Sequence, residues 1–379
     1  MSARRPPHPA MWEGRLLGVV TATLVVFGIA AVYGASSIVA VQMGEAGSAF
    51  ALRQLIGAVV GGFGMLLVAR MDYHVWQRLA WPILLAALVL LMVPFLPGLR
   101  HFAPEINGAR RWISIAGVKL QPSELAKFAV VVWTAMLATK KDELLREFKR
   151  GILPFLVVLV PLAALILFEP NLSTAVLVVL VAGVVLFTAG ARIGHFLLLG
   201  LAAIPVVWRE LVTVQYRLAR MVSFLSAGTD VSETSWQVRQ SLIGIGAGRL
   251  FGVGFGEGMQ KLGYLPYAYS DFIFSTIGEE WGFIGVTVIV LLFALYIAMG
   301  FRIARTASDR FGMLLAAGLT ALVGITAILH IAVTLALIPA TGLPLPFVAY
   351  GRSNLLVSLI ATGIIMSVGA RRAGGMAER

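Results

Sequence analysis

Long apolar runs separated by short polar segments dominate the chain. Each run extends for about 20 residues, the length that an α-helix needs to cross the hydrocarbon layer of a membrane. The runs lack the alternation of apolar and polar residues that is typical of outer-membrane barrel strands. The pattern therefore predicts an all-α integral membrane protein.

We expect a polytopic bundle of about ten transmembrane helices, because about ten runs are long enough to span. The predicted spans are 16–33, 54–70, 79–97, 123–139, 151–168, 172–190, 194–211, 272–300, 312–337 and 346–369. The first run is longer than the apolar core of a secretory signal peptide, which favours a retained span. An even number of spans places both ends, 1–14 and 370–379, on one side of a single membrane domain, 1–379.

Two segments between spans have unusual backbone requirements. Residues 212–271 form a connection far longer than the usual ~4–6 residues. Between Gly244 and Gly258 glycine alternates with Ile, Leu, Phe and Val, which indicates close backbone approach in a large ordered loop. Prolines at 339, 344 and 346 indicate non-helical backbone before the last span, which membranes tolerate only against protein or a cavity.

The composition excludes several classes of protein. With 59% hydrophobic and 13% charged residues the chain is too apolar for a soluble domain, whose charged fraction is about twice as large. The lack of cysteine excludes thiol nucleophiles, disulfides, thiolate metal sites and iron–sulfur clusters. A net charge of +12 in such a chain is more typical of cytoplasmic loops than of nucleic-acid binding.

The positive charges favour one orientation only weakly. With cytoplasmic ends, just over half of the 30 Lys and Arg residues lie inside. Most others fall into two outer loops, which suggests that they bind a polyanion of the outer leaflet. Those cations are Arg100, Arg110, Arg111 and Lys119 in the first loop, and Arg209, Arg217, Arg220, Arg239, Arg249 and Lys261 in the second.

Asp271 is the first candidate for chemistry, because it lies where a long apolar helix is expected to meet water. Three tyrosines, Tyr264, Tyr267 and Tyr269, flank it. A lone acid in this setting suits a general base beside an anionic leaving group. The alternative, of equal weight on these residues, is a helix N-cap.

Glu124 and Lys127 are the second candidates. They share one face of a helix whose first turn contains Pro122, roughly a turn into the bilayer. They form either a cap with a structural ion pair or an anion or metal site. Arg110 and Arg111 suit a phosphate and serve equally well as a membrane anchor.

Other polar positions leave alternatives open. The turn Glu169-Pro170-Asn171 is either a polar hairpin or part of a site. Arg217, Gln237 and Lys261 are surface residues singly, and together they could cradle a diphosphate. The glycine-rich run lacks the G-K-[ST] of a nucleotide-binding loop, and the five histidines lack metal-ligand spacing.

The ordered motifs NGARRWI, QPSELAK, QSLIGIGAGRLFGVGFGEGMQKLGYLP, SDFIF, IGEEWGFIG and GLPLPFVAYG resemble those of the shape, elongation, division and sporulation family, the FtsW/RodA membrane proteins. The resemblance covers nearly the whole chain and is closer to FtsW than to RodA. It implies a peptidoglycan glycosyltransferase of cell division or elongation that polymerises lipid II at the outer face of the bacterial cytoplasmic membrane. It also implies a class B penicillin-binding protein as the partner.

The resemblance implies roles for single residues. The family's essential aspartate matches Asp271, which would deprotonate the acceptor sugar while undecaprenyl diphosphate leaves with inversion. The family's paired arginines match Arg110 and Arg111, its QPSE glutamate and the following lysine match Glu124 and Lys127, and polar positions of its large loop match Gln237 and Lys261. We expect these residues, together with Arg217 and Ser353, to bind the substrate or its diphosphate. We expect a divalent cation, Mg²⁺ or Mn²⁺, as an aid to the leaving group, and no organic cofactor.

The chain departs from the family pattern twice. The motif Q-P-D-L-G-T is here Glu169 to Thr174, with Asn171 in place of the acid. The motif S-Y-G-G-S-S is here Ala349 to Asn354, with Arg352 as an added cation.

Two other functions fit the residues, a flippase for the same lipid and a scaffold that only recruits a transpeptidase. A flippase is less favoured, because the ionisable groups gather at one boundary rather than at mid-bilayer.

Overall fold

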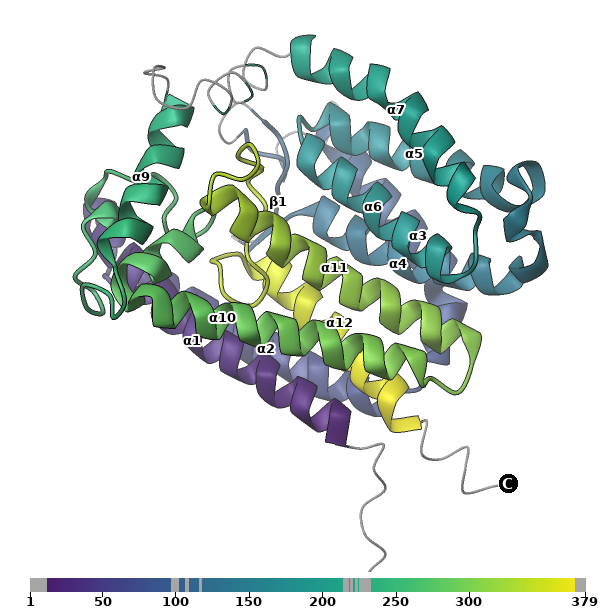
Figure 1. Cartoon of the computed structure of the whole chain (residues 1–379), viewed down its shortest axis with the longest axis horizontal. Coiled ribbons are helices and arrows are strands. Elements are labelled where there is room, and N and C mark those ends of the chain that lie inside the picture. The colour runs from purple at the N-terminus through teal and green to yellow at the C-terminus, as the bar shows by residue number, and fades with distance from the viewer. Residues whose placement is uncertain are drawn as a thin grey trace, which may run out of the picture.

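The structure, a computed structural model, describes residues 12–96, 102–105, 109–115, 118–213, 218, 221, 224 and 233–371. Ten helices of the described chain make up the bundle (Figure 1). They are α1 Trp12–Gln42, α2 Ala49–Arg70, α3 His74–Met92, α4 Pro122–Lys140, α5 Leu153–Phe168, α6 Leu172–Thr188, α7 Ile193–Thr213, α10 Ile273–Arg305, α11 Arg310–Thr334 and α12 Arg352–Arg371.

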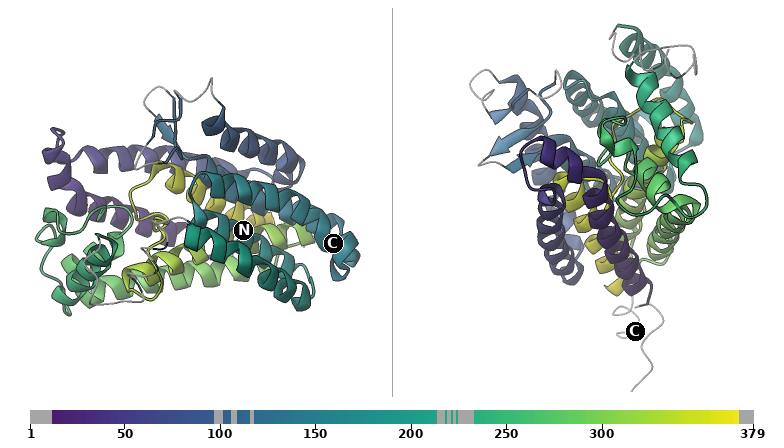
Figure 2. Two further views of the ribbon diagram at one scale, coloured as in Figure 1. Left: turned by 90° about the horizontal axis from the view of Figure 1, so that it is seen from above. Right: turned by 90° about the vertical axis from the view of Figure 1, so that its left-hand side faces the viewer.

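Shorter elements connect these helices. They are the helix α9 Glu233–Ala247, the short turns η2 Val93–Phe95, η4 Asp142–Arg146, η5 Phe148–Ile152 and η6 Gln260–Leu262, and the strands β1 Ile113–Ile115 and β2 Val118–Leu120. The strands form an antiparallel hairpin in which Ser114 lies opposite Lys119. Both views of Figure 2 show this hairpin and the segment after α9 apart from each other.

The prediction of an all-α polytopic membrane protein is confirmed. Within the described residues, eight helices are long and apolar enough to cross a membrane. The other two are α6, which has 17 residues, and α4, which carries Glu124 and Lys127. Some predicted boundaries are wrong. The first helix continues to Gln42 and does not end at 33. The last span begins at Arg352 and not at 346, because the proline-containing segment before it is not helical.

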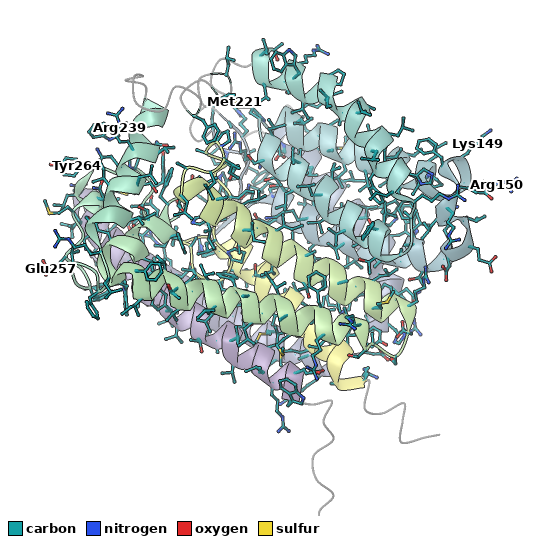
Figure 3. All side chains as sticks on the ribbon, in the orientation of Figure 1. Lys149, Arg150, Met221, Arg239, Glu257 and Tyr264 are labelled. Atoms are coloured by element: carbon teal, nitrogen blue, oxygen red, sulfur yellow. The ribbon has the colours of Figure 1, made fainter. Side chains whose placement is uncertain are left out.

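The start of α1 and the end of α12 lie at the same end of the bundle (Figure 1). We call this the terminal end. The opposite end, the loop end, holds the β-hairpin, α9 and the non-helical segment 335–351. Lys149 and Arg150 project outward at the terminal end, and Arg239, Glu257 and Tyr264 at the loop end (Figure 3).

The centre of the bundle is formed by helices that are buried on most sides. The most apolar windows of α11 and α12 are 78% and 72% buried, and most of α4 is buried as well. α2 packs closely on α12 because glycines face the partner helix: a Cβ on Gly363 would lie 2.4 Å from the carbonyl oxygen of Met65. By contrast, α7 has no buried residue and lies at the periphery.

The glycine-rich segment 248–258 explains a break in α10. Gly282 has φ 64° and ψ −162° inside this helix. The polar groups around the break bond to the segment instead: Val253 N–H donates to the Glu279 carbonyl (2.9 Å), and Phe283 N–H donates to the Arg249 carbonyl (2.8 Å). A Cβ on Gly252 would lie 2.2 Å from the Glu280 carbonyl oxygen. The predicted close backbone approach is therefore confirmed.

Candidate active site

Asp271 lies at the loop end on the segment that leads into α10. The helix begins at Ile273 and Phe272 occupies the N-cap position, so the alternative that Asp271 is the N-cap is wrong. The Asp271 side chain is half-buried, and its backbone N–H donates to the Tyr267 carbonyl (3.1 Å). The carboxylate is thus held at a boundary and still reaches solvent.

An aromatic wall lies beside this carboxylate. The rings of Phe50, Tyr269 and Tyr350 contact one another, with centroids 4.9 to 5.8 Å apart. Burial raises the pKa of Tyr269, and the nearby charge of Asp271 acts in the same direction. Tyr269 therefore stays protonated at neutral pH, as an apolar surface with a hydroxyl donor.

The segment 335–351 connects Asp271 to a second group of polar residues. A Cβ on Gly342 would lie 3.6 Å from Oδ2 of Asp271. Further along, Gln54 of α2 holds the segment by donating to the Ala349 carbonyl (3.0 Å) and accepting from Gly351 N–H (3.3 Å). Pro346 lines a cavity beside the ion pair of α4 that holds about one water molecule.

That ion pair joins Lys127 Nζ to Glu124 Oε1 over 2.8 Å, and both side chains are buried. Asn354 Nδ2 approaches the other Glu124 oxygen at 3.5 Å, while the Ser353 hydroxyl accepts from Gln121 N–H at 3.2 Å. The predicted ion pair is present, and the contact of Asn354 with Glu124 connects it to α12. A further role in substrate binding stays a prediction for Glu124, Lys127 and Ser353.

The candidates in the large loop differ in their surroundings. Lys261 is buried and its Nζ donates to Glu280 (2.8 Å), so its charge is already paired. The neighbouring Glu279 accepts from Met259 N–H (2.8 Å). Gln237 is half-buried on α9, and Arg217 lies outside the described residues. Diphosphate binding by these residues stays a prediction, and for Lys261 it requires the salt bridge to open.

The paired arginines separate in space. Arg111 donates from Nε to the Glu169 carbonyl (2.9 Å) and from a terminal nitrogen to the Pro170 carbonyl (2.6 Å). Arg110 instead pairs with Glu105 at 3.4 Å. Asn171 caps α6 by accepting from Thr174 N–H (3.3 Å), which an amide does as well as an acid. Arg111 therefore anchors the turn at 169–171, and a role of this turn in a site stays a prediction.

Comparison with known proteins decides the family. The sequence profile of cell cycle proteins of the FtsW, RodA and SpoVE type matches residues 15–373. The chain belongs to this family. It is 43% identical over 367 residues to the probable peptidoglycan glycosyltransferase FtsW of Trichlorobacter lovleyi, covering 97% of this chain and 95% of that one. It is 35% identical over 353 residues to stage V sporulation protein E of Bacillus subtilis, covering 93% and 96%.

Solved structures of FtsW/RodA/SpoVE proteins share this fold. A chain of a peptidoglycan synthase complex that coordinates polymerization and crosslinking has a TM-score of 0.74 and 26% identity, covering 94% of this chain and 97% of that one. Rod shape determining protein RodA of Thermus thermophilus has a TM-score of 0.67 and 25% identity, covering 94% and 96%. The family assignment made from the motifs is confirmed.

The prediction of a divalent cation can be compared with the side chains that the structure describes. Among the described residues, no group of three or more His, Cys, Asp or Glu side chains is placed to hold a metal ion. Protein side chains of that part of the chain therefore do not form a complete metal site. The cation stays a prediction, and the mechanism below includes no step through it.

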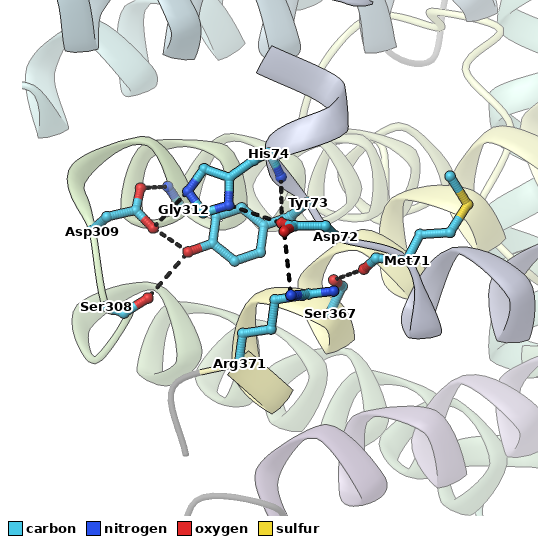
Figure 4. A network of polar contacts seen from close by, with 9 residues as sticks. All are labelled: Met71, Asp72, Tyr73, His74, Ser308, Asp309, Gly312, Ser367 and Arg371. Atoms are coloured by element: carbon cyan, nitrogen blue, oxygen red, sulfur yellow. Dashed lines mark hydrogen bonds and ion pairs between the residues drawn. The ribbon is translucent and has the colours of Figure 1, made fainter. Parts of the chain in front are cut away.

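The terminal end contains a polar cluster that the sequence analysis missed (Figure 4). His74 lies between Asp72 (Nδ1 to Oδ1, 2.8 Å) and Asp309 (Nε2 to Oδ2, 3.5 Å). Tyr73 donates to Asp309, and Arg371 pairs with Asp72 at 3.2 Å. Burial raises the pKa of Tyr73 to about 12. This terminal cluster joins α2, α3, α11 and α12, and its acids are already bonded within the chain.

Proposed function

We propose that this protein is a peptidoglycan glycosyltransferase of the FtsW type, which polymerises lipid II at the outer face of the cytoplasmic membrane. The names of its relatives support the activity. The observation that carries the site is the half-buried position of Asp271 at the loop end, beside the aromatic wall and segment 335–351.

The surroundings of the acids favour Asp271 as the general base. A base must lie within hydrogen-bond reach of the substrate proton. Glu124 and Glu280 are almost completely buried, so neither is open to a substrate hydroxyl. Asp271 is only half-buried, so the hydroxyl of an acceptor sugar can approach it.

In the proposed reaction, Asp271 removes the proton from the 4-hydroxyl of the acceptor's GlcNAc. The oxygen attacks the anomeric carbon of the donor's MurNAc, and the bond to the diphosphate breaks with inversion of configuration. Undecaprenyl diphosphate leaves with the electron pair. Fixed cations stabilise this developing charge. Candidates from the sequence are Arg110, Arg111, Lys127, Arg217 and Lys261. Among them, Arg110 pairs with an exposed acid, Glu105.

The orientation and the partner are part of the proposal. We place the terminal end in the cytoplasm, because its connections carry many lysines and arginines, among them Lys140, Lys141, Lys149 and Arg150. The loop end then faces the outer leaflet. The similar synthase complex, which coordinates polymerization and crosslinking, supports a class B penicillin-binding protein as the partner.

The test is lipid II polymerisation by the purified protein with its partner. We expect Asp271→Asn to lower the rate by about 100- to 10,000-fold, because an amide cannot accept the proton. Asp309→Asn in the terminal cluster is the matched control and should keep activity. Glycan strands made by Asp271→Asn at the wild-type rate would contradict the base assignment. No turnover by wild-type protein would instead favour the scaffold or the flippase.

A further inference from the structure

Segment 248–258 exposes large apolar side chains at the loop end of the bundle, where its green trace lies at the left of Figure 1. Phe251 is 77% exposed, and Leu250, Val253 and Phe255 are exposed as well. Apolar patches at a protein surface mark contacts with another protein or with a membrane. The aromatic wall and segment 335–351 do not include these side chains, so their exposure needs an explanation of its own.

The backbone of this segment is bonded to α10, although its side chains are exposed. Besides the two hydrogen bonds given above for the break, Gly254 N–H donates to the Glu280 carbonyl (3.2 Å) and Ile284 N–H donates to the Leu250 carbonyl (3.2 Å). Non-helical backbone is tolerated at the depth of lipid chains only where its polar groups are bonded. These hydrogen bonds satisfy several main-chain groups of the segment, as contact with lipid requires.

Gly252 explains why the apolar side chains point outward. Its φ is 84°, and a Cβ at this position would lie 2.2 Å from the Glu280 carbonyl oxygen, so Gly252 faces α10. Its neighbours Phe251 and Val253 are exposed and are turned away from this contact. The exposure of Phe251 therefore follows from the fit between the segment and α10.

Two helices give the level of this segment in the membrane. On α10, about 20 positions separate Arg302 at the terminal end from the break at Gly282, a rise of about 30 Å. On α1, about 21 positions separate Trp12 from Tyr33, which is a rise of similar length. Both distances begin at one level, because Arg302 lies over the Trp12 ring (5.1 Å). Since a hydrocarbon layer is about 30 Å thick, Tyr33 and the break both lie at its boundary on the loop side.

The segment packs against the helices at this boundary. The Phe255 ring contacts Tyr33 of α1 (centroids 6.4 Å apart) and Trp281 of α10 (5.9 Å). Tyrosine and tryptophan are enriched where lipid chains meet headgroups. The next residues of α10, Phe283 and Ile284, are exposed and apolar. The apolar side chains of the segment therefore continue the exposed surface of the membrane-spanning part of α10.

We propose that segment 248–258 is an interfacial anchor, which inserts Leu250 and Phe251 into the lipid leaflet at the loop end. The neighbouring Arg249 is exposed, and an arginine beside inserted apolar residues keeps its charged group among the lipid phosphates. The anchor joins the loop end to the membrane surface at the break in α10. It requires the membrane spans and not the proposed activity, while its assignment to the outer leaflet follows the orientation proposed above.

A protein partner fits this surface less well. Interfaces between proteins contain about one hydrogen bond per 100–200 Å². The exposed side chains Leu250, Phe251 and Val253 carry no polar atom, and the N–H groups of Val253 and Gly254 are already bonded to α10. Lipid chains require no hydrogen bonds. The chemistry and the level of the segment therefore both favour lipid.

The experiment measures the depth of the segment with a fluorescent label. The chain has no cysteine, so Phe251→Cys provides a unique site for bimane. The labelled full-length protein is placed in phosphatidylcholine nanodiscs whose lipids carry a nitroxide either near the headgroup or near the end of the acyl chain. We expect the nitroxide near the headgroup to cause the larger loss of fluorescence, and iodide in the buffer to cause little. Leu250→Cys is a second site that should give the same result.

Two control positions of similar exposure calibrate the measurement. Val41 of α1 is 63% exposed and lies about 12 Å beyond Tyr33 along the helix. A label at Val41→Cys should lose fluorescence with iodide and not with either nitroxide. Leu291 is 62% exposed and lies about midway between Gly282 and Arg302 on α10. A label at Leu291→Cys should be quenched most by the nitroxide near the chain end.

The proposal is overturned if iodide quenches the labels at positions 250 and 251 as it quenches the label at position 41. It is also overturned if these labels become protected from iodide only when the partner protein is added, because the surface would then be a protein interface. The measurement contains no lipid II, so its result is independent of the proposed function. Protein that fails to polymerise lipid II while its label at position 251 is quenched by lipid would refute the activity and leave the anchor in place.

Discussion

The two ends of the bundle use charged residues in different ways. At the loop end the Lys261–Glu280 pair is almost fully buried, with exposed fractions of 3% and 1% for the two side chains. At the terminal end the His74–Asp72 pair has exposed fractions of 45% and 41%. Water screens the exposed pair and not the buried one. Ion pairs of the same length therefore differ in how much stability the protein loses when they are broken, and the predictions below test that difference.

The largest effect on stability is expected from Lys261→Met. This change leaves the Glu280 carboxylate buried without its partner, which costs about 3–5 kcal/mol. We would measure it by thermal unfolding of the purified protein in detergent. The double variant Lys261→Met/Glu280→Leu should recover most of the loss, since it leaves no buried charge. A single variant as stable as wild type would show that the loop end is open to water.

The next effect is a dependence of stability on pH through Glu169. The pKa of this carboxyl is about 8 in the folded protein and near 4.5 when exposed, so the folded state holds the proton more tightly. Its contribution to stability is full below about pH 4.5 and is lost as the pH rises toward 8. Between pH 5 and 8 we expect wild-type protein to lose about 3–4 kcal/mol of unfolding free energy relative to Glu169→Gln. The same change of unfolding free energy with pH in wild-type protein and in Glu169→Gln would contradict this prediction.

A smaller effect is expected from Asp309→Ala in the terminal cluster. Asp309 caps α11 by accepting from Gly312 N–H (2.9 Å), and it also accepts from Tyr73. Loss of the cap and of this bond should destabilise the protein by about 1–2 kcal/mol. Lipid II polymerisation at a temperature where the variant is folded should be unchanged. A loss of activity comparable to that of Asp271→Asn would show that the two ends are coupled.

The smallest effect is expected from Arg371→Ala. Its ion pair with Asp72 is exposed, with fractions of 44% and 41%, and spans 3.2 Å. Such pairs contribute about 0–1 kcal/mol. The unfolding temperature should therefore shift within experimental error at physiological salt. A shift as large as that of Lys261→Met would contradict the distinction between the two ends.

Apolar run length predicted the helices well, because a membrane span needs a continuous apolar stretch. Each predicted span overlaps one observed helix. The start of α12 was predicted too early, because residues 346–351 continue the apolar run of this helix in the sequence. In the structure, hydrogen bonds from Gln54 to this segment hold it as a loop. That contact joins residues 295 positions apart, so no local pattern could predict it.

The candidate site was only partly predictable for the same reason. Local motifs identified Asp271 and the Glu124–Lys127 pair, which lie within single segments. The aromatic partner Phe50 comes from α2, far from Tyr269 and Tyr350 in sequence. The burial of Glu169 was also missed, since a Glu-Pro-Asn turn is typical of a solvated hairpin. A tertiary contact, with Arg111, anchors that turn.

The break at Gly282 has a consequence for exchanging parts between relatives. Segment 248–258 supplies the hydrogen-bond partners that α10 lacks at this point, so neither is complete alone. A chimera that takes only the loop, or only the helix, would join two surfaces fitted to different backbones. The unit that can be transplanted is the block from Gly248 to Ile284, and swap boundaries placed outside it should give folded hybrids.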